Sequence, residues 1–416
     1  MNSDLHTFQL PNGLRVICKP VAHTSLIHCG LMINTGSRDE RESDNGVAHF
    51  IEHAVFKGTE KRKGYQILNR IENVGGEINA FTTRDKTCFY LTALKTYGQR
   101  SFELLSDLVL HPNFPEKEMD KEKKVILEEI EMYMDAPEES IYDDFYQMAY
   151  PDHPLGFNIL GSRSSIEKMK TADLKQFKMK QYQPEQMVLS VVGHISPLKV
   201  KKWALRYFGD YQSGGGESRN RTTPQKTAAF EQKLTKDFQQ SHCIMGSYAY
   251  HQYDAKRFPF YVMVNLLGGE SMNSRLNLAI REKYGYVYQI NAQFSLFEDS
   301  GIFSVDMATE AQYLEKCIQL TQKEFKKLRD RKLGRIQLSQ AKKQLIGQMA
   351  IAEENNNIQM QSLAKMSLDF DRIYEMEEIA QKISEVTASD ILAVANEVLD
   401  EKQLSILVYD GKAGNG

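Results

Sequence analysis

A helix followed by an apolar strand occurs twice in this chain, and this repetition limits the possible folds more than any other feature. The first copy reads "TADLKQFKMKQYQPEQMVLSVVGHIS" and the second reads "TASDILAVANEVLDEKQLSILVYDG". Aligning Asp173 with Asp390 gives an offset of 217 residues, and the same offset places Leu189 on Ile406. Self-similarity at a fixed offset indicates a repeated structural unit, so the sequence predicts two similar halves.

A polar stretch near the middle of the chain separates these halves. The segment "GDYQSGGGESRNRTTPQK", from Gly209 to Lys226, is rich in Gly and Ser and has no apolar periodicity, which is typical of a linker. We therefore expect an N-terminal domain over residues 1–210, a linker over 211–226 and a homologous C-terminal domain over 227–416. With 416 residues in all, each domain has about 200 residues, a usual domain size.

The order of predicted elements within the first half indicates the fold class. A strand hairpin is expected around "PNG" at residues 11–13, and a second hairpin, "EINAFTTRDKTCFYLTAL", turns near Arg84 and Asp85. Long helical patterns cover about residues 97–110 and 115–134. Strands and helices that occur in runs favour an α+β fold, in which helices pack on a mainly antiparallel sheet, over a doubly wound parallel sheet.

Composition excludes several classes of function. The 52 basic and 55 acidic residues leave a net charge of −3, which argues against a nucleic-acid partner, and no stretch has the roughly 18 apolar residues that a membrane span needs. The five cysteines are scattered without a CxxC pair, which argues against a disulfide framework. The N-terminal sequence resembles neither a signal nor a transit peptide, so a cytoplasmic location is expected, although a trimmed chain would look the same.

One short motif carries the chemistry of a metal site. Residues His49, Phe50, Ile51, Glu52 and His53 form an HxxEH pattern within a helical stretch. Two histidines four positions apart lie on one helix face, so both can direct an imidazole nitrogen at one zinc ion, with Glu52 beside the metal. Catalytic zinc keeps three protein ligands and a water, whose pKa it lowers from about 15.7 towards about 7. The alternative is a helix with two partly exposed histidines.

A third ligand could come from a later helix that is dense in carboxylates, "PEKEMDKEKKVILEEIEMYMDAPEES". Glu122 and Glu129 lie seven positions apart on one stripe of this helix, with Ile126 between them. Acidic residues are also typical of a solvated helix face, which is the expected place of three others, Glu118, Glu128 and Glu131. Spacing alone does not choose the ligand.

These motifs together resemble a known family. HxxEH is followed by an E-x6-E helix whose second Glu lies 76 residues after the second His, and "LPNGLRV", "NRIENVGGEINAFTTRDKTCFY" and "SRLNLAIREKYGYVYQI" extend the similarity over nearly the whole chain. The chain resembles the pitrilysin, insulin-degrading enzyme and mitochondrial processing peptidase family. The resemblance implies a zinc-dependent endopeptidase acting on peptides or unfolded polypeptide segments. It implies that Zn²⁺ binds to His49, His53 and Glu129, that Glu52 activates the water and that Glu122 supports the site.

The resemblance also implies residues that handle the substrate. Asn79 and Ala80 would lie on an edge strand that pairs with the backbone of an extended peptide. Arg281 and Tyr288 would reach over the scissile bond and donate hydrogen bonds to the developing oxyanion. On the residues alone, Asn79 would be a turn residue, Ala80 an ordinary strand position, and the Arg/Tyr pair a surface arginine and a packed tyrosine.

The resemblance further implies a homodimer. Long relatives carry four such domains around a closed chamber, whereas this chain has two, so a second copy would complete the chamber. The Arg281/Tyr288 pair of one protomer would then serve the zinc of the other. Two alternatives stay open: a catalytically silent scaffold of the same fold, and a processing peptidase dedicated to one precursor.

Overall fold

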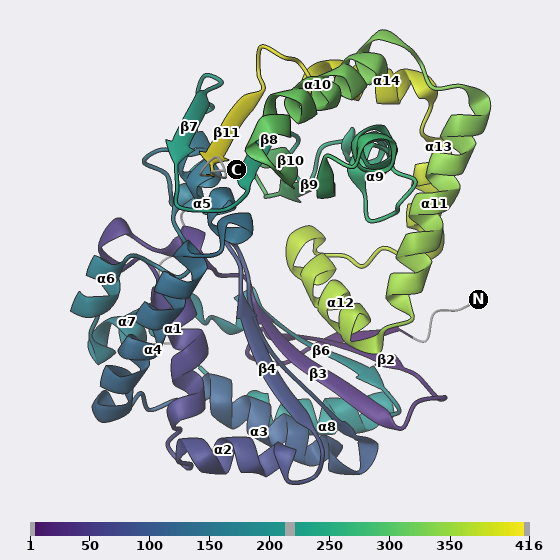
Figure 1. Ribbon diagram of the computed structural model, residues 1–416. Coiled ribbons are helices and arrows are strands. Elements are labelled where there is room, and N and C mark those ends of the chain that lie inside the picture. Colours follow the sequence, from purple (N-terminus) through teal and green to yellow (C-terminus); the bar gives the residue numbers. More distant parts are fainter. Residues whose placement is uncertain (1–4, 213–220, 412–416) are drawn as a thin grey trace. The chain divides into compact units, whose positions relative to one another are not determined.

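The computed structural model describes residues 5–212 and 221–411 (Figure 1). The chain forms two compact units, each built from segments that are discontinuous in sequence. The first unit comprises Met1–Met132, Asp152–Thr222 and Ile351–Ile373, and the second comprises Tyr133–Pro151, Thr223–Ala350 and Tyr374–Gly416. The linker expected over 211–226 falls largely on residues 213–220, which lie outside the described residues, and the domain limits stay a prediction.

A six-stranded mixed sheet forms the centre of the first unit, in the order β1-β2-β6-β3-β5-β4. The strands β2 and β6 run parallel, and the other neighbours run antiparallel. Both predicted hairpins are confirmed, and β4 lies at one edge of the sheet. The strand bounds are His6–Gln9 (β1), Arg15–Pro20 (β2), Leu26–Ile33 (β3), Glu77–Thr82 (β4), Thr87–Leu94 (β5) and Met187–Gly193 (β6).

Helices cover both faces of this sheet, as the first unit in Figure 1 shows. Alternate residues of β6 serve two cores: Leu189 and Val191 face the larger core, whereas Val188 and Val192 pack against Met360 of α12. A strand buried on both faces is mostly apolar, which explains the run "MVLSVV" with Ser190 as its polar exception. The helices of this unit are α1 (Val47–Ala54), α2 (Gly64–Glu72), α3 (Gly98–Leu110), α4 (Glu116–Met134, which ends just beyond the unit), α6 (Arg163–Lys168), α7 (Thr171–Gln181), α8 (Pro197–Phe208) and α12 (Asn356–Phe370).

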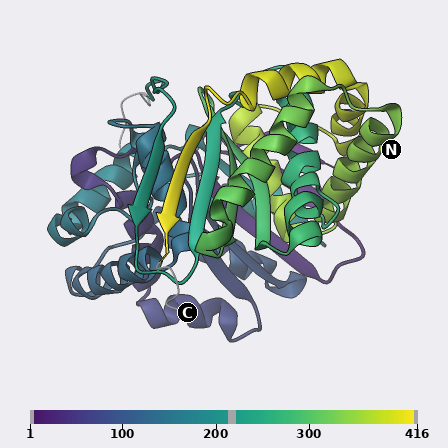
Figure 2. The same ribbon diagram turned by 45° about the horizontal axis from the view of Figure 1, so that its top comes forward.

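The second unit has a five-stranded sheet in the order β7-β11-β8-β10-β9. Figure 2 shows the yellow strand β11 between β7 and β8, and β7 and β11 form the parallel pair. The strand bounds are Glu231–Thr235 (β7), Ser241–Tyr248 (β8), Val287–Leu296 (β9), Gly301–Thr309 (β10) and Ser405–Asp410 (β11). The helices are α5 (Pro137–Ala149), α9 (Arg257–Gly268), α10 (Leu314–Asp330), α11 (Arg335–Glu353), α13 (Met376–Glu385) and α14 (Ala388–Val398), together with a π-helical turn over Asn277–Glu282.

The two sheets repeat one topology. The order β2-β6-β3-β5-β4 in the first unit matches β7-β11-β8-β10-β9 in the second. The strand directions repeat as well: β6 runs parallel to β2 and antiparallel to β3, and β11 runs parallel to β7 and antiparallel to β8. The repeat expected from the sequence is the pair α7–β6 and its copy α14–β11. The predicted α+β class with two similar halves is confirmed.

Two further observations concern exclusions made from the composition. Among the described helices, none combines the length and the apolar character that a membrane span requires. All five cysteines are buried as free thiols, and none forms a disulfide.

Candidate active site

A buried carboxylate holds the beginning of the motif helix α1. Glu40 accepts hydrogen bonds from the backbone N–H of Gly46 at 2.7 Å and of Ala48 at 2.8 Å, and from the side chain of Asn45 at 2.9 Å. Burial raises the pKa of Glu40 to about 8, although these three donors act in the opposite direction. Gly46 has φ +92°, and a Cβ there would lie 2.7 Å from the carbonyl oxygen of Leu160. The start of α1 is therefore fixed by its cap and by close backbone packing.

The structure brings the three expected metal ligands together. His49 Nε2 lies 3.8 Å from Glu129 Oε1, and His53 Nε2 lies 3.4 Å from Glu129 Oε2. The possible ligand atoms of these three residues all lie within 4.8 Å of one another. Within the described ranges this is the one group of three or more His, Cys, Asp or Glu residues that could hold a metal ion. The two histidines of α1 and Glu129 of α4, which are far apart in the sequence, therefore lie close together in the structure.

The donor set fits zinc. Two imidazoles and one carboxylate form a ligand set that catalytic zinc accepts. Burial, together with the charge of His53, lowers the pKa of His49 to about 3, so this ring is neutral, as a ligand must be. Nδ1 of the buried His49 has no hydrogen-bond partner among the described residues, and 3.8 Å to Glu129 is too long for a hydrogen bond. A cation held between the rings and Glu129 would bind Nε2 of His49, the nitrogen that faces Glu129.

Glu122 and Lys57 orient the second histidine. Glu122 is 4% exposed; its Oε1 lies 2.9 Å from His53 Nδ1 and its Oε2 lies 2.6 Å from Lys57 Nζ. Burial would raise the pKa of Glu122, but His53 and Lys57 outweigh it and lower the pKa. An ionised Glu122 accepts the proton of Nδ1, which leaves Nε2 of His53 as the atom that faces Glu129.

Glu52 lies on α1 between the two histidines, as expected, and is largely shielded from solvent. Burial raises the pKa of Glu52, whereas Thr82 at the end of β4 and the charge of His53 act in the opposite direction. A carboxylate whose pKa is raised towards neutral pH is a better proton acceptor than an ordinary surface glutamate. The site therefore pairs a candidate base with a candidate metal group.

Asn79 and Ala80 lie in the edge strand β4, where the resemblance places them. Asn79 pairs with Tyr90 and Ala80 with Phe89 of β5, and the sheet order puts no described strand on the other side of β4. Asn79 is exposed, whereas Ala80 is half-buried against the larger core. Both residues are strand positions and neither lies in a turn. Their role in substrate binding stays a prediction.

Arg281 and Tyr288 lie beside each other in the second unit. Arg281 belongs to the π-helical turn and Tyr288 to the edge strand β9, and the guanidinium carbon lies 5.7 Å from the tyrosine ring centroid. Tyr288 is 82% exposed, so the alternative of a packed tyrosine is wrong. The neighbouring Tyr286 is the packed one, because it stacks on Tyr284 and Tyr313. The action of the Arg/Tyr pair on a substrate stays a prediction.

Sequence reasoning missed two residues that shape the site. Lys57 lies four positions after His53, so its spacing on the helix face was a usable signal. Glu40 carries no such signal, because its contacts with the start of α1 depend on how the chain folds back after β3. Lys57 acts on Glu122, the partner of His53, and Glu40 acts on the backbone at the start of α1.

The fold and the site together define a candidate two-domain metallopeptidase, and comparisons with known proteins agree. Residues 15–163 match the family model described as insulinase (peptidase family M16), and residues 168–345 match the model described as peptidase M16 inactive domain. The chain is 30% identical to an uncharacterized zinc protease of Bacillus subtilis over 95% of this chain and 96% of that protein. It is 28% identical to an uncharacterized zinc protease of Rickettsia bellii over 98% of both.

Solved structures show the same fold. A protease from Helicobacter pylori superposes with a TM-score of 0.90 at 21% identity, covering 98% of this chain and 99% of that one. A crystal structure described as a peptidase M16 inactive domain from Pseudomonas fluorescens gives a TM-score of 0.91 at 20% identity, covering 98% of both chains. The chain belongs to the insulinase family of peptidases, peptidase family M16. The family resemblance predicted from the sequence is confirmed.

Proposed function

We propose that this protein is a zinc-dependent endopeptidase that hydrolyses peptides or unfolded polypeptide segments. The observation that carries the proposal is the convergence of His49, His53 and Glu129 beside the half-buried Glu52. The names of the relatives as zinc proteases support it. The substrate class follows from the family and from the open edge of β4, because main-chain pairing tolerates many side chains.

Each residue of the site has a separate task in this proposal. Zinc, when held by the three ligands, supplies an acidified water and polarises the peptide carbonyl. Glu52 would accept a proton from the attacking water and pass it to the leaving amine, and its raised pKa suits both transfers. Glu122 and Lys57 keep His53 oriented throughout.

The substrate would lie extended along β4, held by the backbone of Asn79 and Ala80. Arg281 and Tyr288 would donate hydrogen bonds to the oxyanion that forms during attack. An exposed phenol next to a guanidinium suits this task, since Tyr288 is open to solvent and the Arg281 guanidinium lies over its ring. We propose a homodimer enclosing a chamber, in which this pair serves the zinc site of the other protomer.

A digest of mixed peptides by the purified protein tests the proposed activity. We expect internal cleavages, detected by mass spectrometry, that stop with a chelator and return when zinc is restored. No cleavage by protein that contains one zinc per chain would refute the activity and favour the silent scaffold. Cleavage of only a few sequences would indicate a dedicated processing peptidase, and cleavage of many would indicate a general one. A cytoplasmic location stays a prediction.

The shared site has its own test. Inactive Glu52→Gln protein is mixed with inactive Tyr288→Phe protein under conditions in which subunits exchange. In a mixed dimer one site would receive both defects and the other neither, so activity should return to about a quarter of wild type. If the pair acts within its own chain, every site keeps one defect and no activity returns. Exchange is checked independently with differently tagged subunits.

A further inference from the structure

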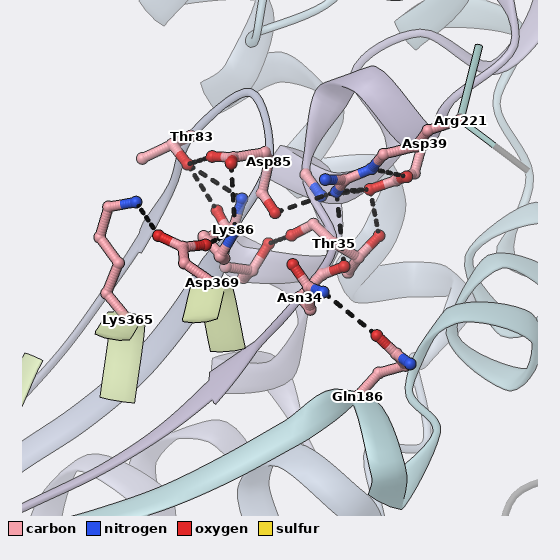
Figure 3. A network of polar contacts seen from close by, with 12 residues as sticks. Asn34, Thr35, Asp39, Thr83, Asp85, Lys86, Gln186, Arg221, Lys365 and Asp369 are labelled. Carbon is pink, nitrogen blue, oxygen red and sulfur yellow. Dashed lines mark hydrogen bonds and ion pairs between the residues drawn. The ribbon is translucent and has the colours of Figure 1, made fainter. Parts of the chain in front are cut away.

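A buried network of charged and polar groups lies at one end of the sheet in the first unit (Figure 3). It joins two segments that are adjacent in the fold: the strip of residues 34–40 after β3, and the turn of residues 83–86 between β4 and β5. Two further contributions come from far along the chain, Arg221 and the last turn of α12. We call this set the turn network.

Arg221 is the centre of one half of the turn network. Its Nε and Nη2 each donate to the carboxylate of Asp39 at 2.7 Å, and the two side chains are 4% and 2% exposed. Nη2 also lies 3.1 Å from the carbonyl oxygen of Asp85 and 3.5 Å from that of Asn34. One guanidinium therefore ties the end of β3, the strip and the turn together, with the two-pronged geometry that arginine forms with a carboxylate.

Lys86 is the centre of the other half. Its Nζ lies 2.8 Å from Asp369 of α12 and 3.1 Å from Asp85, and Lys365 lies 2.5 Å from the same Asp369. Burial would raise the pKa of Asp85, but the charges of Lys86, Lys365 and Arg221 outweigh it and lower the pKa to about 2. Asp85 thus remains ionised and paired, which a buried charge requires.

The turn network reaches both sides of the candidate active site. The backbone N–H groups of Ser37 and Arg38 donate to the carbonyls of Thr83 and Arg84, which joins the strip to the turn. The strip ends in Glu40, which caps α1, the helix of Glu52. The turn begins directly after β4, the strand expected to hold the substrate. Displacement of the strip against the turn would therefore change the separation of catalytic helix and substrate strand.

We infer that Arg221, through Asp39, is a positioning residue that sets the separation between α1 and β4, an inference that rests on the proposed peptidase function. Apolar residues could fill this space with equal or greater stability, because paired buried charges seldom add net stability. They would not fix three backbone segments by directed hydrogen bonds. The ion pair is thus suited to precise placement, and a misplacement of about 1 Å can cost on the order of 100-fold in rate.

Three variants test the role of this ion pair: Arg221→Met, Asp39→Asn and the double variant. Each single change leaves a buried charge without its partner, so we expect kcat/KM for an extended peptide to fall by about 10- to 100-fold. The double variant should recover part of this loss. Zinc should stay near one per chain in all three, since no ligand changes. Arg221→Lys, which keeps the charge but loses the two-pronged contact, should give an intermediate loss.

Hydrogen exchange supplies the measurement that a general loss of stability would not reproduce. In Arg221→Met we expect faster amide exchange in residues 36–48 and 77–87, with exchange in the second unit unchanged. Arg41→Met is the matched control, because Arg41 directly follows the strip but is 73% exposed in its pair with Asp44. This control should match wild type in rate and exchange.

The possible failures are distinguishable. Wild-type protein that cleaves no peptide refutes the proposed function, whereas the exchange result can still be read. Arg221→Met with wild-type kcat/KM and wild-type exchange at 36–48 and 77–87 overturns the inference. Equal acceleration of exchange in both units, with loss of zinc, also overturns it, because the role of Arg221 would then be general stability.

Discussion

The two units repeat one sheet, yet the helices at equivalent places differ in chemistry. Between β3 and β4 the first unit has α1, which carries His49, Glu52 and His53. Between β8 and β9 the second unit has α9, with the sequence "RFPFYVMVNLLG" and a buried face of apolar residues. The scaffold is therefore compatible with either helix, and the metal group depends on a few side chains placed on it.

Buried charge shows the same contrast. Among the described residues, the buried acidic and basic residues Arg38, Glu40, Asp85, Lys86, Asp107, Glu122 and Asp369 belong to the first unit, and Glu324 belongs to the second. Charged groups are costly to bury unless paired, so their concentration needs a reason beyond stability. The first unit holds the candidate site. Glu40 and Glu122 contact the motif helix α1, and Asp85, Lys86 and Asp369 belong to the turn network. The description of the second family match as an inactive domain agrees with this division.

Loss of a ligand is expected to have the largest effect. Glu129→Gln should lose the metal and with it peptide hydrolysis, measured by metal analysis and by the peptide digest. The neighbouring Glu128, which is exposed, supplies the control, and Glu128→Gln should keep both. Zinc retained in Glu129→Gln but lost in Glu128→Gln would show that the ligand is assigned one residue too far along α4.

The second unit is expected to contribute through Tyr288 alone among its neighbouring tyrosines. Tyr288→Phe removes a donor to the oxyanion, so kcat should fall by about 100- to 1,000-fold with zinc retained. Tyr284→Phe is the control, because that ring stacks on Tyr286 and its hydroxyl has no assigned role. Wild-type kcat in Tyr288→Phe would remove Tyr288 from the chemistry and leave Arg281 as the remaining candidate of the second unit.

The support of His53 gives a smaller effect. Glu122→Gln weakens the contacts with His53 and Lys57, so the affinity for zinc should fall by about 10- to 100-fold in a competition titration with a chelator. Glu118→Gln, a change to a half-buried acid on the same helix that pairs with Lys121, should leave the affinity unchanged. Equal affinities for both variants and wild type would remove Glu122 from the site.

The smallest effect concerns Lys178 of the first unit, whose Nζ donates to the carbonyl of Leu110. Burial lowers the pKa of Lys178 from 10.5 to about 8. Between about pH 8 and 10.5 the unfolded chain therefore binds more protons at this residue than the folded chain, so its contribution to stability rises with pH. As the pH rises through this window, the Tm of wild type should increase relative to the Tm of Lys178→Met.

The control for this shift is Lys175→Met, an exposed change on the same helix. Its Tm difference from wild type should stay constant over the same pH range. A constant difference for Lys178→Met as well would show that Lys178 keeps its proton in the folded protein.

Local patterns allowed much of this structure to be predicted. HxxEH has a spacing set by helix geometry, so His49 and His53 could be named from the residues, whereas Glu129 was named only because the family resemblance implies it. The repeat of the pair α7–β6 as α14–β11 could likewise be predicted, because the same helix and strand patterns recur 217 positions later in the sequence. Both features depend on residues that are close together in the sequence.

What could not be predicted depends on contacts between distant segments. Residues 133–151 belong to the second unit and residues 351–373 to the first. Periodicity cannot reveal this exchange, because an amphipathic helix does not specify which sheet it covers. Arg221 and Asp39 are 182 positions apart, and a lone arginine near a polar stretch is usually solvated. Glu40 was missed because a cap is assigned from adjacent residues, and this one precedes α1 by a loop.

The central claim is that one unit carries a hydrolytic zinc site in which Glu52 moves the proton. Glu52→Gln tests it most directly, with zinc content and peptide hydrolysis measured on the same preparation. The account predicts zinc near one per chain and a fall in kcat of about 100- to 10,000-fold, because the ligands remain and only the base is lost. Hydrolysis at the wild-type rate with zinc retained would contradict it.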